Sequence, residues 1–273
     1  MTTLSADIRL YKQRASYSIF AALHIFSESP VAHVAFIHPG DKPGEGQKRE
    51  ETLMNLPLIM VIVQDGEDDE DPESYAVYLH THKHAGVVEA VQRGLETLTA
   101  TTTQIDGMIL SPTAHNHTLN YRSATLHLYK PSVLCDSSDH AEKTDALAAV
   151  TNTVVGYDRI KDVGMPIKAN VEGTAIVRCR IKTFSCKQRY GAFSGEQEPI
   201  LDAPENDQGQ AFQGVVPCWT QWGQPLGFGR DRAEVKQIFK EKGDKGRKFS
   251  ERVAWANEDV AIEGLGKRRG AQR

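Results

Sequence analysis

The sequence predicts a mainly β protein, an antiparallel Greek-key β-barrel with peripheral helices. Segments rich in β-branched and aromatic residues recur along most of the chain and end at turn residues such as Pro39 and Gly40. Few connections between them have the apolar spacing of a helix, whereas a doubly wound sheet needs a helix after almost every strand. Residues 172–191 alternate in the manner of one long strand.

The expected elements follow from these patterns. A helix, or two short ones broken near Ala15, should precede the first strand. Further helices are expected at 84–94 and 138–155. Strands are expected at 31–41, 53–64, 74–80, 95–111, 117–131 and 172–191, and within 211–228. The pair Asp106-Gly107 predicts a turn that divides 95–111 into two strands.

Two interruptions indicate irregular places in this barrel. Pro57 stands inside the apolar run 53–64 and cannot donate a hydrogen bond to a sheet, so it marks an edge, a strand start or a bulge. Backbone groups left unpaired there could face a ligand. The acidic run 65–73 predicts a mobile hairpin tip, because its like charges repel.

Composition bounds the class of protein. The chain has 273 residues, 40% of them apolar and 25% charged, and no apolar run approaches the roughly 20 residues that a membrane span needs. A net charge of -4 gives no overall attraction to nucleic acid or to anionic lipid. The start of the chain lacks the pattern of a secretion signal and the four cysteines form no CxxC pair, so we expect a cytoplasmic protein without a zinc ribbon or disulfide framework. Residues 1–230 are expected to form the barrel domain with its N-terminal helical segment, and 231–273 a charged helical extension and tail.

An ordered series of short motifs carries a family resemblance. The series is RASY (14–17), HVAFI (33–37), LPL (56–58), YLH (78–80), DGMIL (106–110), HTLNYRS (117–123), KQRYG (187–191) and GVVP (214–217). In this order it resembles the pyridoxamine 5'-phosphate oxidase-like FMN-binding split-barrel family, in particular the branch of flavin-nucleotide-binding proteins and 5-nitroimidazole resistance reductases. The similarity spans roughly residues 11 to 226.

The resemblance implies a function and a set of site residues. It implies a six-stranded split barrel that forms a homodimer, holds FMN between two subunits and acts as an oxidoreductase on a small organic substrate. The flavin ring would lie along the strand with Pro57 and Leu58, and the phosphate just after His80. The implied cofactor-binding residues are Pro57, Leu58, His80, Thr81, His82, Lys83, His84, Asn120, Tyr121, Arg122, Ser123, Lys187 and Arg189. His80 or Tyr121 is expected to deliver protons near the flavin.

The expected phosphate site departs from the family pattern. Relatives commonly have serine and arginine there, whereas this chain has Thr81, Lys83 and His84. Lysine is a point charge without the bidentate fork of arginine, which predicts weak or lost FMN binding. A phosphate needs several donors and positive charge near a helix start, and Lys83 and His84 can supply both.

Several groups have more than one interpretation. The guanidinium of Arg122 is costly to bury unpaired, so it needs an anionic partner, either the flavin phosphate or a carboxylate. His80, His82 and His84 alternate and could join His115 and His117 as metal ligands, but no acidic residue is placed with them, so we expect no metal site. Two alternative functions stay open: a flavin- or heme-binding protein without turnover, and a split-barrel enzyme that has lost flavin and uses a histidine-rich pocket.

Overall fold

The structure is a computed structural model that describes residues 7–40, 51–111, 114–191 and 212–254. Residue contacts divide the chain into two compact units. The described part of the larger unit is 7–40, 51–103 and 123–187, and that of the smaller unit is 104–111, 114–122, 188–191 and 212–254. The domain boundary expected at residue 230 stays a prediction.

Strands dominate the described chain. Six of them are long, and two are short additions, namely β1 (Ala15–Ser16) and β8 (Gly214–Pro217). The long strands are β2 (Val31–His38), β3 (Thr52–Gln64), β4 (Tyr75–His82), β5 (Thr97–Leu110), β6 (Thr118–Val133) and β7 (Thr174–Arg189). The helices are α1 (Ile19–Ser27), α2 (Gly86–Gln92), α3 (His140–Val155), α4 (Ile160–Val163), α5 (Lys168–Gly173) and α6 (Arg232–Ala254), with three 3₁₀ turns, η1 (Lys12–Arg14), η2 (Pro72–Ser74) and η3 (Ala114–Asn116).

The long strands close into a ring. Their order is β7-β4-β3-β2-β5-β6, and β6 also pairs with β7. Because β5 returns to lie beside β2 after the β2-β3-β4 meander, four of the strands follow the Greek-key order. Buried side chains from all six fill the inside: Val34, Met60, Leu79, Ala100, Leu126 and Ile181. The predicted fold class, a Greek-key antiparallel barrel, is therefore confirmed.

Strand β3 divides its length between two partners. Its residues from Thr52 to Ile59 pair with β2, and those from Ile59 to Gln64 pair with β4. Pro57 lies in the first part, opposite His33, where β3 pairs with β2 and not with β4. Its missing N–H therefore removes no bond to β4, and of the three alternatives for Pro57, an edge, a strand start or a bulge, the structure contains the edge.

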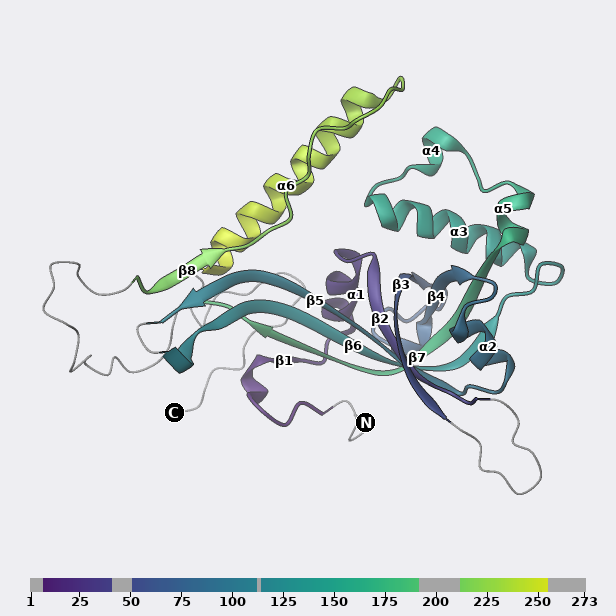
Figure 1. Ribbon diagram of the computed structural model, residues 1–273, viewed down its shortest axis with the longest axis horizontal. Coiled ribbons are helices and arrows are strands. Elements are labelled where there is room, and N and C mark those ends of the chain that lie inside the picture. Colours follow the sequence, from purple (N-terminus) through teal and green to yellow (C-terminus); the bar gives the residue numbers. More distant parts are fainter. Residues whose placement is uncertain (1–6, 41–50, 112–113, 192–211, 255–273) are drawn as a thin grey trace, which may run out of the picture. The chain divides into compact units, whose positions relative to one another are not determined.

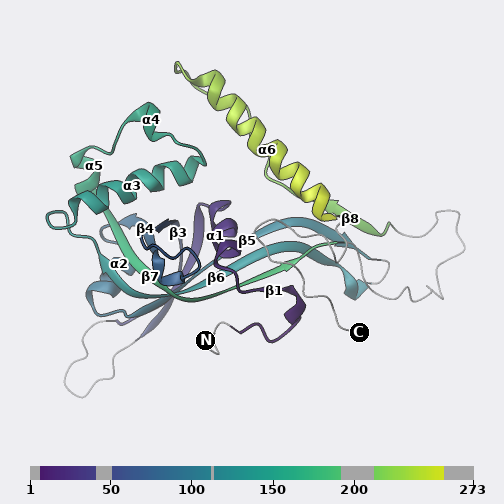
Figure 2. The ribbon, with the colours of Figure 1, turned by 180° about the vertical axis from the view of Figure 1, so that it is seen from behind.

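Helix α3 covers only one part of the outer face of the barrel. The outward residues Val61, Ala76, Tyr78 and Ile176, from β3, β4 and β7, pack against Ala146, Leu147 and Val150 of α3 and Val171 of α5. Figure 1 and Figure 2 both show α3, α4 and α5 grouped beside these strands. Tyr78 donates a hydrogen bond to Glu142 at the start of α3, and Arg178 pairs with the same carboxylate. Apolar packing and this ion pair together hold α3 to the sheet.

The expected turn at Asp106-Gly107 is wrong, because β5 runs through both residues as one strand. The alternation of buried and exposed residues along β5 is interrupted there, because Asp106 and Gly107 are both buried. A Cβ on Gly107 would lie 3.0 Å from Val215 Cγ1 and 3.2 Å from the carbonyl oxygen of Val216, both in β8. The glycine therefore permits a close strand contact and does not make a turn.

Helix α6 belongs to the smaller unit and occupies most of the described C-terminal segment. The chain that follows β8 runs back along it (Figure 1), with the ring of Trp222 5.0 Å from that of Phe239. Ser250 donates a hydrogen bond to the carbonyl oxygen of Cys218. No helix in the described ranges is both long enough and apolar enough to cross a membrane.

Candidate functional site

A row of side chains crosses the outer face of the barrel where α3 does not cover it. His33 on β2 is paired with Pro57 on β3 and with Thr101 on β5. The Oγ1 atoms of Thr101 and Thr125, the latter on β6, are 3.2 Å apart. Directly paired residues share one face of a sheet, so four strands contribute to this row. His33 and Pro57 are exposed, and the two threonines are half-buried.

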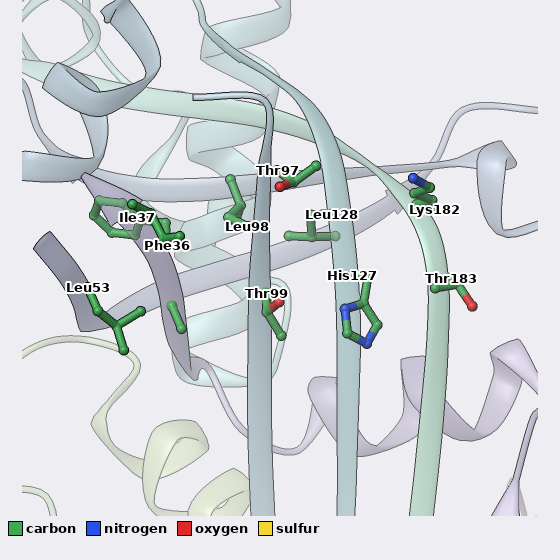
Figure 3. A pocket seen from close by; sticks show the side chains of 11 residues that line it. Phe36, Ile37, Leu53, Thr97, Leu98, Thr99, His127, Leu128, Lys182 and Thr183 are labelled. Carbon is green, nitrogen blue, oxygen red and sulfur yellow. The ribbon is translucent and has the colours of Figure 1, made fainter. Parts of the chain in front are cut away.

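A groove of about 430 Å³ lies next to this row in the larger unit. The paired residues Ala35 and Thr99, two positions along from His33 and Thr101, line it. The other lining residues are Phe36, Ile37, Leu53, Thr97, Leu98, His127, Leu128, Lys182 and Thr183. Figure 3 shows Thr99, His127 and Thr183 on three neighbouring strands. The groove combines apolar walls with hydroxyl groups, one imidazole and the exposed ammonium of Lys182, a composition suited to a planar polar ligand.

The expected phosphate loop lies at the end of β4. The backbone N–H groups of His84 and Ala85 donate to Nδ1 and to the carbonyl oxygen of His82, which makes a tight turn. His82, Lys83 and His84 are exposed, and the two imidazole rings are 5.3 Å apart. Helix α2 begins at Gly86, directly after this turn. The turn therefore gathers one ammonium and two imidazoles at the surface.

His80 lines a second pocket on the outer face of β4. This pocket measures about 480 Å³ and lies between β4, α3 and the segment that contains α4 and α5. Its walls are mostly apolar: Leu147, Val150, Ile160, Val163, Met165, Pro166 and Ile167, with Thr151, Gly164, Asn170 and Thr174 beside them. Burial lowers the pKa of His80 from its ordinary value of 6.5, which favours the neutral form of its imidazole. A half-buried neutral imidazole in an apolar pocket can accept a proton or bind a metal.

Arg122 lies in the smaller unit and has a carboxylate partner. Its Nε and Nη2 atoms donate to the two oxygens of Asp106 over 2.9 and 2.7 Å, and both side chains are about 95% buried. The guanidinium also lies 4.1 Å from the ring centre of Phe249. Of the two partners that the sequence left open, the structure contains the carboxylate.

Asn120 and Arg189 form a second buried contact in the smaller unit. Asn120 donates to the carbonyl oxygen of Gly191 and accepts a hydrogen bond from Arg189. The neighbouring Tyr121 is half-buried, with its side chain on the opposite face of β6 from Asn120. The contacts of Asn120 and Arg189 brace strand ends, so their cofactor-binding role stays a prediction.

The other predicted residues belong to the larger unit. Ser123 donates to the carbonyl oxygen of Lys187, which joins β6 to β7. The side chain of Leu58 is buried on the inner face of the barrel, so only its backbone can contribute to a site on the outer face. The strand register places His80 and Pro57 on the same outer face, because His80 pairs with Ile59, two residues after Pro57.

Sequence analysis missed the residues that line the groove, above all Thr99, His127 and Lys182. One signal could have found them. The segment TLTATTT (97–103) alternates threonine with apolar residues, which indicates a strand with a hydroxyl-bearing face. Among the described residues, no group of three or more His, Cys, Asp or Glu side chains is arranged to hold a metal ion.

Comparisons with solved structures identify the fold. The flavocytochrome Anf3 from Azotobacter vinelandii matches with a TM-score of 0.57 and 22% identity, over 84% of this chain and 90% of that one. An FAD and heme binding protein from Mycobacterium smegmatis matches with a TM-score of 0.54 and 20% identity, over 80% of this chain and 90% of that one. No protein-family model and no curated protein sequence matches the chain.

The class of fold follows from the closed ring and these similarities. The protein is an antiparallel split barrel. More particularly, it has the six-stranded split-barrel fold that the motif series predicted.

The Arg122–Asp106 pair generates a stability prediction. Replacing Asp106 with Ala leaves a buried guanidinium without its carboxylate, which should lower the free energy of unfolding by about 3–5 kcal/mol. Asp244→Ala is the control, because the side chains of Asp244 and Arg247 are nearly half exposed and 4.0 Å apart, and it should cost less than about 1 kcal/mol. Urea denaturation measures both. Equal, small losses in the two variants would show that the buried pair contributes no more than a surface pair.

Proposed function

We propose that this protein is an FMN-binding oxidoreductase that acts on a small organic substrate and holds the flavin on the outer face of its barrel. The observation that carries the proposal is the groove of about 430 Å³ beside the His33–Pro57 row. It lies on the part of the sheet that α3 does not cover, and it combines an apolar wall with hydroxyl, imidazole and ammonium groups. A flavin ring presents the same mixture of apolar surface and polar edge atoms.

Two further facts support a flavin. The split-barrel structures that the chain resembles are described as a flavocytochrome and as an FAD and heme binding protein. The exposed turn with Lys83 and His84 offers positive charge for a phosphate on the same outer face. FMN is the form proposed here because the motif series resembles FMN-binding proteins.

The chemistry in this proposal is divided between cofactor and protein. A bound flavin supplies hydride or electron transfer, and the protein supplies orientation and charge. The ammonium of Lys182 would stabilise negative charge that develops on the ring system. His80 and Tyr121 are the proposed proton donors. Burial favours the neutral imidazole of His80, which can deliver a proton only after it has accepted one.

Flavin titration tests the proposal. Lys83→Ala should remove a charge-assisted contact to the phosphate and weaken FMN binding by about 1.5–3 kcal/mol, roughly tenfold to a hundredfold. Riboflavin, which lacks the phosphate, should be much less affected. Lys182→Met should weaken the binding of both FMN and riboflavin, because Lys182 lines the groove. Lys168→Ala, at an exposed site on α5, should change the affinity for neither.

Calorimetry of wild type and variants distinguishes the outcomes. Equal affinity of the wild type for FMN and riboflavin would mean that no phosphate site exists at residues 80–84. No binding of either flavin would exclude the proposed function.

We also propose that the protein is a homodimer. The groove contains the paired residues Ile37 and Leu53, which are 52% and 77% exposed. Large apolar side chains with this exposure on a flat sheet face favour burial against a second copy of the chain.

Light scattering tests the dimer. The wild type should have roughly twice the 30.2 kDa mass of one chain. Leu53→Glu should shift it to the monomer, because a buried carboxylate is costly, and Val154→Glu on α3 should leave it dimeric. A monomeric wild type at micromolar concentration would contradict the proposal.

The pocket at His80 favours a second candidate function, heme binding. Histidine and methionine are both common axial ligands of heme iron, and His80 and Met165 line this one apolar pocket. Its volume of about 480 Å³ lies within the usual range of small-molecule sites. In this interpretation His80 binds iron and does not deliver protons to a flavin.

Absorption spectroscopy with added hemin tests this candidate. The wild type should develop a Soret band, and His80→Ala should remove or shift it because an axial ligand is lost. Free imidazole should restore the band in that variant, and His24→Ala on α1 should behave as wild type. Identical spectra for wild type and His80→Ala would show that His80 does not bind heme.

A further inference from the structure

A basic cluster lies where β1 meets β7 in the larger unit, and Lys187 is its one residue that belongs to the cofactor-binding set implied by the family resemblance. It is built on Tyr11, which has left-handed backbone angles (φ 56°, ψ 53°) and stands just before the η1 turn. The N–H of Arg14 donates to the carbonyl oxygen of Tyr11 over 2.9 Å. This turn places the guanidinium of Arg14 over the Tyr11 ring, 4.4 Å from its centre.

The strand pairing brings a second cation to the same ring. Ala15 on β1 pairs with Lys187 on β7. The Lys187 ammonium lies 5.6 Å from the centre of the Tyr11 ring. Lys12 belongs to the same turn as Arg14 and is exposed. Two half-buried cations therefore flank one aromatic ring, with a third beside them.

The positive charge of this cluster is not neutralised by the described parts of the chain. Within residues 7–40, 51–111, 114–191 and 212–254, no carboxylate forms an ion pair with Arg14, Lys187 or Lys12. The Nε atom of Arg14 is buried and has no hydrogen-bond partner there. The cation–π contact with Tyr11 partly stabilises the positive charge of Arg14, but it gives the Nε–H group no hydrogen-bond acceptor.

We propose that this cluster binds a phosphate or diphosphate group. A guanidinium presents several N–H donors in a planar fork that fits phosphate oxygens, and an ammonium adds a second charge. The two side chains together match a dianion better than a single carboxylate. Tyr11 and Leu10 are 51% and 67% exposed beside the cluster, so an organic group attached to the phosphate would have apolar surface to contact.

The cluster lies apart from the Lys83 turn, because His82 pairs with Thr174 at the start of β7 whereas Ala15 pairs with Lys187 near its end, so the proposed anion site is separate from the proposed phosphate loop. The proposal does not require FMN in the groove, because a phosphate group from any nucleotide has the same chemistry. Two sources are considered: the diphosphate of a bound dinucleotide flavin, and the phosphate of a separate nucleotide.

Calorimetric titration with inorganic pyrophosphate tests the proposal directly. The wild type should bind saturably, and Arg14→Met and Lys187→Met should each weaken binding by about tenfold or more, since each removes a charge-assisted contact. Lys168→Met removes one exposed positive charge from α5 and should change the affinity by less than about twofold. Thermal unfolding of the three variants checks that each one is folded.

Two results would overturn the proposal. One is the absence of saturable pyrophosphate binding to the wild type at millimolar concentration. The other is an equal effect of Lys168→Met and the two cluster variants, which would indicate only general charge attraction.

Titration of the same proteins with FAD and riboflavin identifies the source of the phosphate. If FAD binding weakens in Arg14→Met while riboflavin binding is unchanged, the cluster binds the flavin diphosphate. If pyrophosphate binding weakens and FAD binding is unchanged, the cluster binds a phosphate group that does not belong to a flavin. Either result supports the anion site.

Discussion

The pairing of β6 with β7 is the interaction on which the rest of the structure depends. It joins the two ends of the strand order and turns a six-strand sheet into a ring. Closure separates an inner face, filled by side chains such as Leu79 and Leu126, from an outer face, and the first part of β3 remains an edge because it pairs only with β2. The groove meets this core at Phe36, Leu98 and Leu128, whereas its exposed groups, such as Leu53 and Lys182, do not contribute to the core.

The sequence predicted the fold well because its signals are local. Alternation, turn residues and the missing N–H of Pro57 act within a few residues, and the strands and the edge at Pro57 were therefore predicted correctly. The turn predicted at Asp106-Gly107 was wrong because this residue pair is typical of a hairpin turn. In the structure, both residues instead serve contacts with distant parts of the chain. Asp106 pairs with Arg122, and Gly107 makes room for β8 more than a hundred residues later in the chain.

The candidate site could be predicted only in part, because sequence signals are local whereas distant strands assemble the site. His80, Lys83 and Pro57 belong to recognisable motifs and were singled out, and the register places Pro57 and His80 on one face. Lys182 and His127 carry no motif, and only closure of the barrel brings them to one groove with Leu53. The sequence predicted that Arg122 has an anionic partner, either the flavin phosphate or a carboxylate. The structure was needed to identify this partner as Asp106.

Strand β3 has a consequence for how such a protein can change over evolution. Its outward residues after Pro57, such as Val61, are packed under α3, whereas Leu53 and Asn55 before it are exposed. Substitutions in the first half can therefore alter what the outer face binds without loosening the helix on the second half. One continuous strand thus combines a segment that can tolerate substitution with a segment whose residues are fixed by packing against α3. The boundary between them lies where the neighbour of β3 changes from β2 to β4.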